Sequence, residues 1–194
     1  MTSLREIALA LVATSAVLLG ARGAAAEVLS GTYSAEDTSG HGARLSVVAA
    51  EGHVLLSFAA AFAIGSTVNT CHCLARGEAA GAARYRIAGP EDLSGSLKAD
   101  AGSVVLEVTR QECCGEGFSG VQEFAASTRR PLRVRTVKAH RAQFLALDER
   151  PTGAYVVAGD RVETGEADPV TDLVVARFVG RRTTLGFLRV ADLE

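Results

Sequence analysis

The chain of 194 residues contains no tryptophan, and aromatic residues make up only 5% of it. It has one methionine and four prolines, whereas apolar residues as a whole account for 48%. Large aromatic clusters can therefore contribute little to a hydrophobic core. Any core must be built mainly from valine, leucine and alanine.

The chain also lacks the motifs of common hydrolases. Neither the G-x-S-x-G pattern of serine hydrolases nor the H-E-x-x-H pattern of zinc peptidases occurs. His41, His53 and His140 have no Asp or Ser at a recognisable catalytic spacing, and Glu91-Asp92 lies in a Gly-Pro turn typical of solvated loops. The sequence therefore predicts a non-enzymatic protein that needs no cofactor.

A strong charge of one sign is absent as well. The formal net charge is −2, which disfavours nucleic-acid binding as a main function. The charge is unevenly distributed, because acidic residues outnumber basic ones from Glu27 to Ser127 and the reverse holds from Thr128 onward. This change indicates two small domains rather than one large one.

The N-terminus has the features of a cleaved export signal. Arg5 precedes a continuous apolar run, Ile7–Gly20, and Ala24–Ala26 provide the small residues that a signal peptidase requires. The run is shorter than the roughly 20 residues that span a bilayer as a helix. We therefore predict that residues 1–26 are removed, that the mature protein has no stable membrane insertion, and that it is periplasmic or extracellular.

Residues 27–127 are expected to form a cysteine-containing antiparallel β-domain. Two hairpins are predicted from alternating apolar segments, Ala43–Phe62 and Leu93–Thr109. The second strand of the first hairpin is apolar on both faces, which predicts a central position, although its alanines also permit a helix over Leu55–Phe62. With a turn at Gly77–Gly81, the pattern predicts six to eight strands in a sandwich or small barrel.

Four cysteines occur as two close pairs, Cys71 with Cys73 and Cys113 with Cys114. Bridges within either pair are strained, so we expect two disulfides that join one pair to the other, with the connectivity open. A Cu(I) or Zn(II) site that includes His72 and a reactive thiol are the alternatives. On the disulfide interpretation, His72 faces away from both cysteines and lies at the surface.

A basic segment follows the first domain. Thr128–Phe144 holds six Arg or Lys residues and no acidic residue. This segment is interpreted as a solvated linker that feeds an edge strand, as a patch for an anionic partner, or as a segment docked against the acidic first domain. The linker itself is placed at residues 128–138.

The last forty residues form a recognisable pattern of four short strands, turns and a final helical turn. In DLVVARFV, alternation puts Val174, Ala176 and Phe178 on one face, which predicts a core. The order of these elements resembles the bacterial Src-homology-3-like barrel of secreted and cell-wall proteins, here residues 139–194. The resemblance implies binding to peptidoglycan or to a peptide of an envelope protein.

In such barrels, ligands bind in a groove that is lined by aromatic residues from the loops. The positions that match here are Tyr155, Phe178 and Phe187, with Asp172 as a polar neighbour. Phe187 stands after glycine, where relatives usually carry tryptophan. The resemblance therefore predicts these four residues as ligand-binding.

A second resemblance covers most of residues 30–125. A G-x-Y start at Gly31 and Tyr33, Cys71 before a glycine-containing turn, and Cys114-Gly115 followed by Phe118-Ser119-Gly120 resemble secreted lysozyme-inhibitor-type β-domains. This resemblance implies inhibition of a wall-degrading lysozyme as an alternative function, and metal binding by the cysteines is a third. Altogether the sequence predicts an all-β, secreted binding protein with two domains.

Overall fold

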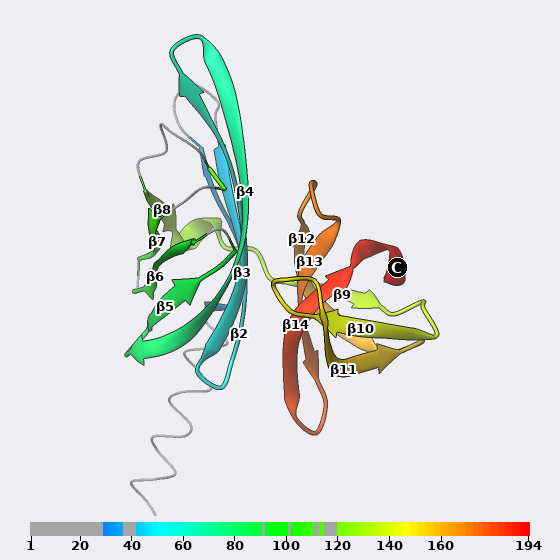
Figure 1. The fold of residues 1–194 in the computed structure, drawn as a ribbon. Helices are drawn as coiled ribbons and strands as arrows, with labels where there is room; N and C mark the ends of the chain where they lie inside the picture. The colour runs from blue at the N-terminus through cyan, green and yellow to red at the C-terminus, as the bar shows by residue number, and fades with distance from the viewer. Residues whose placement is uncertain (1–28, 37–41, 91, 101, 111–112, 115–119) are drawn as a thin grey trace, which may run out of the picture.

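The computed structural model describes residues 29–36, 42–90, 92–100, 102–110, 113–114 and 120–194. The predicted signal segment 1–26, His41, Glu91 and residues 118–119 lie outside the described residues. The fold is all-β, as predicted, and consists of two antiparallel sheets (Figure 1). No helix among the described residues is long and apolar enough to cross a membrane.

The first sheet is an eight-stranded meander in which each strand pairs with the next in the chain. It curls into a nearly closed barrel. The segment after the eighth strand reaches the first strand through two backbone hydrogen bonds between Thr32 and Arg130, of 2.9 and 2.7 Å. Its strands are β1 (Gly31–Glu36), β2 (Gly42–Ala50), β3 (His53–Ile64), β4 (Thr67–Gly81), β5 (Arg84–Ala88), β6 (Ser94–Ala99), β7 (Ser103–Arg110) and β8 (Val121–Ala125).

The interior of this barrel is filled by side chains from alternate positions of its strands. Phe124 lies near the rings of Tyr33 and Phe58, each with a centroid separation of 6.4 Å. The Tyr33 hydroxyl donates a hydrogen bond of 2.7 Å to the Leu29 carbonyl. Burial raises the pKa of Tyr33, and the nearby Arg129 partly offsets this effect. Among the described residues, the barrel core thus contains four buried aromatic residues, Tyr33, Phe58, Tyr85 and Phe124.

The predicted hairpin Ala43–Phe62 is confirmed, and its second half is strand β3 rather than a helix. Tertiary packing overrides the helix propensity of alanine here, because alternate β3 residues such as Leu56 and Phe58 enter the barrel. The turn predicted at Gly77–Gly81 is wrong, since β4 continues to Gly81. Gly77 is needed for close packing: a Cβ atom there would lie 2.7 Å from the Val54 side chain.

The second sheet has six strands in the order β11-β10-β14-β13-β12-β9. Val162, Val174 and Leu188 lie in its own core. Its strands are β9 (Arg133–Thr136), β10 (Arg141–Leu145), β11 (Pro151–Val157), β12 (Arg161–Ala167), β13 (Leu173–Val179) and β14 (Thr183–Arg189); short 3-10 helices are η1 (Ala126–Thr128) and η2 (Val190–Asp192).

The basic segment 128–138 is more structured than a linker. Arg133–Thr136 forms edge strand β9 and pairs with β12, so the second sheet begins before residue 139. Arg129 donates two side-chain hydrogen bonds, of 3.0 and 2.7 Å, to the Ser30 carbonyl. The segment therefore contacts the first sheet and contributes a strand to the second.

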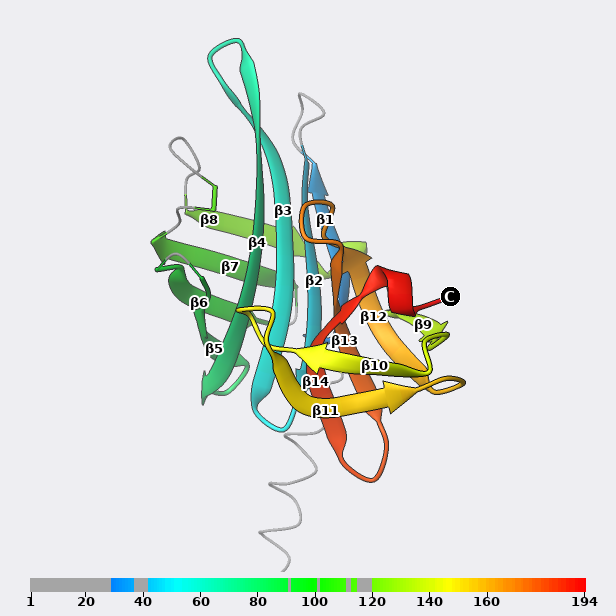
Figure 2. The ribbon, with the colours of Figure 1, turned by 45° about the vertical axis from the view of Figure 1, so that its right-hand side comes forward.

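The two sheets pack against each other through an apolar cluster. Val48 of the first sheet lies with Val175 and Phe187 of the second in this cluster. β12 approaches β2 so closely that a Cβ atom at Gly165 would lie 2.5 Å from the Ser46 side chain. Figure 2 shows the second sheet lying against the outer face of the first. The outer face of β2 and β3 is therefore an interface.

Candidate functional site

The cysteine prediction is confirmed: two disulfides join β4 to the corner after β7. They pair Cys71 with Cys114 and Cys73 with Cys113, with Cα–Cα distances of 4.3 and 5.6 Å. The sulfur atoms of Cys71, Cys73 and Cys114 lie within 4.8 Å of one another. Since all four cysteines are oxidised, these sulfurs are not thiolates that could ligate a metal in this state.

His72 is not the surface residue that the sequence suggested. It does point away from the cysteines, but the second sheet covers it, and 23% of its side chain is exposed. Its Nδ1 atom is buried without a hydrogen bond and lies 3.8 Å from Oδ2 of Asp168. The imidazole of His72, on the outer face of β4, thus lies next to the carboxylate of Asp168 in the loop after β12.

Asp168 is almost fully buried, with 2% exposure. Its Oδ1 accepts hydrogen bonds from the backbone N–H groups of Val170 and Thr171, at 3.0 and 2.9 Å, and from the Thr171 hydroxyl at 3.0 Å. These donors fix the carboxylate in an Asx-type turn and leave Oδ2 on the side of His72. Sequence reasoning missed this residue, because the contact joins the two sheets.

A polar pocket of about 310 Å³ adjoins this turn. Ser46 accepts a 3.0 Å hydrogen bond from the Glu166 backbone N–H, and Arg44 forms a 3.2 Å ion pair with the Glu166 carboxylate. These polar groups thus mainly join the sheets. The pocket is lined by Arg44, Ser46, Ser57, Ala59, Glu166, Ala167, Asp168 and Pro169.

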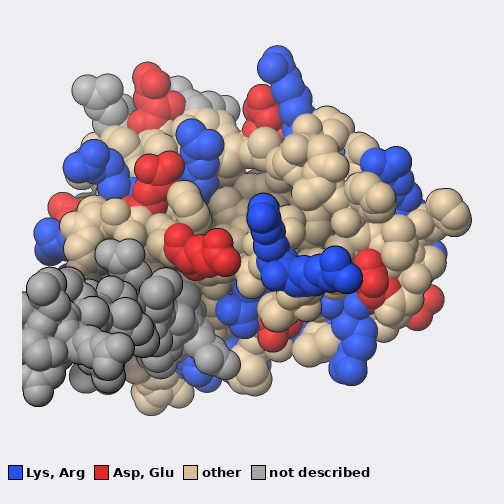
Figure 3. Space-filling model, turned by 90° about the horizontal axis from the view of Figure 1, so that it is seen from below, with Lys and Arg blue, Asp and Glu red and all other residues tan. Residues whose placement is uncertain are grey.

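A second cavity, of about 520 Å³, opens between the sheets near the ends of β5 and β10. We call it the leucine groove. Its apolar wall contains Leu55, Leu145, Leu147, Leu185 and Phe187, and its rim carries Arg76, Asp148 and Thr152. Figure 3 shows a hollow walled by uncharged side chains near the middle of the lower face, with basic side chains beside it.

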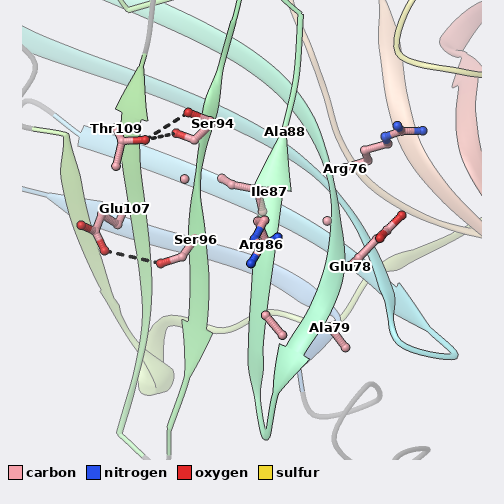
Figure 4. Close-up of a pocket in the computed structure, with 13 residues that line it drawn as sticks. Arg76, Glu78, Ala79, Arg86, Ile87, Ala88, Ser94, Ser96, Glu107 and Thr109 are labelled. Carbon is pink, nitrogen blue, oxygen red and sulfur yellow. Dashed lines mark hydrogen bonds between the residues drawn. The ribbon is translucent and has the colours of Figure 1, made fainter.

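A third cavity, of about 690 Å³, lies on the outer face of β4 to β7, and we call it the polar tray. Glu78, Arg86, Ser96 and Glu107 form one row of cross-strand neighbours in it. The Ser96 hydroxyl donates a 3.4 Å hydrogen bond to Glu107 (Figure 4). Small residues, among them Gly77 and Gly95, also line the polar tray.

The polar tray and the leucine groove adjoin at two shared residues. Arg76 and Ala88 line both cavities, and the two residues are direct partners across β4 and β5. Arg76 is exposed at this junction, and Figure 4 shows it on the same side of β4 as Glu78. Together the two cavities offer an extended site with an apolar half and a polar half of mixed charge.

The four residues predicted to bind ligand do not come together. Tyr155 is 51% exposed, and the Arg141 guanidinium lies 3.9 Å above its ring. Phe178 packs against the core of the second sheet, and Asp172 is exposed at a turn, where its N–H donates to the Asp168 carbonyl. Phe187 alone lines one of the three cavities, although it is only 1% exposed.

The tray residues were missed in the sequence even though a signal was present. Alternation in ARYRIA and SVVLEVT places Arg86 and Glu107 on the face opposite the barrel interior. It does not show that these two strands flank β6 and that their polar side chains line one cavity. Comparisons with protein families, curated proteins and solved structures find no match. The two resemblances therefore stay predictions.

Proposed function

We propose that this chain is a non-enzymatic binding protein that holds an extended polypeptide segment of an envelope partner. The observation that carries the proposal is that the leucine groove and the polar tray adjoin, with Arg76 and Ala88 lining both. Ligand sites prefer concave surfaces at interfaces between structural units, with an apolar wall and a few polar groups. This site has both features.

A polypeptide fits this site better than a glycan does. Sugars are usually held on exposed aromatic faces, and the aromatic residue of the leucine groove, Phe187, is 1% exposed. A peptide alternates apolar side chains with polar groups and carries charges of both signs. Its apolar side chains would enter the leucine groove, and its polar groups would meet Arg86, Glu78 and Glu107 in the polar tray.

The disulfides indicate an oxidising compartment, which agrees with the proposed binding of an envelope partner. Disulfides form and persist mainly in secreted and periplasmic proteins, and this chain has two. The predicted signal over residues 1–26 and the Src-homology-3-like pattern of the C-terminal strands agree with this. We place the mature protein in the periplasm or outside the cell.

The proposal is tested by filling the leucine groove from either wall. Ala88 and Ala146 are exposed and line it, so Ala88→Arg and Ala146→Arg introduce a long cationic side chain without disturbing a core. Peptides selected by the mature protein from a displayed library of random 12-residue peptides are expected to carry apolar side chains. We expect each variant to bind them at least about tenfold more weakly, a loss of about 1.4 kcal/mol.

The matched control is Ala158→Arg, at an exposed position in the turn between β11 and β12 that lines none of the three cavities. It should bind as the unmodified protein does. Failure to enrich any peptide, or equal binding by all three variants, would reject the peptide site. If both groove variants still sediment with insoluble peptidoglycan, the protein binds the cell wall through a surface outside the leucine groove.

Lysozyme inhibition is kept as a second candidate because of the β3–β4 hairpin. β2 pairs with β3 only as far as Ala60, and β5 pairs with β4 only from Arg76. The hairpin therefore extends beyond its neighbours, as Figures 1 and 2 show, and its residues 59–70 carry no charged side chain. Such a projection fits a concave enzyme cleft.

For this candidate we expect micromolar protein to slow the clearing of a cell-wall suspension by lysozyme. Val68 is 56% exposed on the hairpin, and Val68→Glu should abolish inhibition because it introduces a charge at the contact. Val157→Glu, at a valine that is 42% exposed on β11, should leave inhibition unchanged. Unchanged clearing rates with the unmodified protein would eliminate this candidate.

A further inference from the structure

The two disulfides lie in direct contact with each other. The Sγ atom of Cys73, in one bridge, is 3.5 Å from the Sγ atom of Cys114, in the other. A thiolate attacks a disulfide by approaching one of its sulfur atoms, and the distance here is that of touching atoms. A thiolate formed at Cys73 would therefore have a sulfur of the other disulfide in contact with it.

Only one cysteine of the cluster is more than slightly exposed. Cys71, Cys73 and Cys114 are 1, 3 and 6% exposed, whereas Cys113 is only partly buried at the edge of the core. An external thiol must reach the sulfur that it attacks, so access favours attack at Cys113. The cluster thus has an accessible sulfur at one side and buried sulfurs behind it.

We propose that the four cysteines form a thiol–disulfide exchange relay whose accessible end is Cys113 and whose substrate is a dithiol. In the first step, a thiolate of the dithiol attacks Sγ of Cys113. A mixed disulfide forms there, the Cys73–Cys113 bond breaks, and Cys73 leaves as a thiolate. The number of disulfide bonds is unchanged, and one thiolate has replaced another.

In the second step, the Cys73 thiolate attacks Sγ of Cys114. The Cys73–Cys114 bond forms, the Cys71–Cys114 bond breaks, and Cys71 leaves as a thiolate. The second thiol of the dithiol then attacks its own sulfur in the mixed disulfide and releases Cys113. The dithiol is oxidised by two electrons, and the protein keeps one bridge, Cys73–Cys114, with thiols at Cys71 and Cys113.

The relay predicts which cysteines become free under limited reduction. Native full-length mature protein would be treated with one equivalent of dithiothreitol, quenched with acid, alkylated and mapped by peptide mass spectrometry. We expect the label on Cys71 and Cys113 and an intact Cys73–Cys114 bridge. Label on Cys73 and Cys113 with the Cys71–Cys114 bridge intact would overturn the relay, as would label on Cys71 and Cys114.

A variant tests the second step by itself. Cys113→Ser leaves an odd thiol at Cys73 beside the Cys71–Cys114 bridge, and we expect the label to be shared between Cys73 and Cys71. Label on Cys73 alone would contradict the exchange. Cys114→Ser is the matched control. It removes the sulfur that Cys73 contacts at 3.5 Å and leaves the Cys73–Cys113 bridge in place. In this variant we expect the label on Cys71 alone. If either variant fails to fold, the limited reduction of the unmodified protein decides the question.

Discussion

Replacing Phe187 by alanine is expected to lower the free energy of unfolding by about 3–5 kcal/mol, the usual cost of removing a buried phenylalanine. Phe187 is 1% exposed and lies in the apolar cluster that joins the two sheets. Denaturant unfolding followed by circular dichroism measures the effect.

Tyr155→Ala is the matched control, because the sequence grouped Tyr155 with Phe187 as ligand-binding residues. Tyr155 is 51% exposed, and its main contact is the guanidinium of Arg141 above its ring. Loss of such an exposed cation–π contact costs about 0.5–1 kcal/mol. If the two variants were equally stable, Phe187 would not hold the sheets together.

The contrast between these two residues shows what the sequence can and cannot predict. Alternation correctly placed Val174, Ala176 and Phe178 in the core of the second sheet, since a strand has a side-chain period of two. Leu173 and Val175 lie on the opposite face of β13, in the apolar cluster between the sheets. Alternation did not show that the first sheet covers that face.

The same limit explains the candidate site. Hairpins follow from local patterns, so a meander of six to eight antiparallel strands was predictable, and the structure has eight. The leucine groove, by contrast, combines Leu55 and Leu147, which are far apart in the chain and come together only when the sheets dock. Asp168 and His72 meet for the same reason. Contacts between sheets depend on a relative orientation that no local pattern specifies.

The disulfides fasten the same barrel that supplies the polar tray. β4 carries Cys71 and Cys73 and continues to Arg76 and Glu78 in the tray. The strand is also the one whose outer face meets the second sheet at Leu74. A change in the bridges would therefore act on a strand that takes part in the barrel, the interface and the site.

Removal of both disulfides is expected to lower the free energy of unfolding by more than twice as much as removal of one. Cys71–Cys114 and Cys73–Cys113 close nested loops with sequence separations of 43 and 40. While either bridge remains, the long loop stays closed, and only a ring of a few residues is opened. On the chain-entropy relation, that ring is worth about 2 kcal/mol, whereas the long loop is worth about 4 kcal/mol.

The variants that test this are Cys71→Ala with Cys114→Ala, Cys73→Ala with Cys113→Ala, and the fourfold replacement. We expect losses of about 2 kcal/mol for each pair and about 6 kcal/mol for all four, measured by denaturant unfolding. A fourfold variant that does not fold, beside two folded pair variants, would agree with this order. Additive losses within about 0.5 kcal/mol would show that the bridges act independently, because independent sites add within that margin. The nested connectivity would then contribute no cooperative stabilisation to β4.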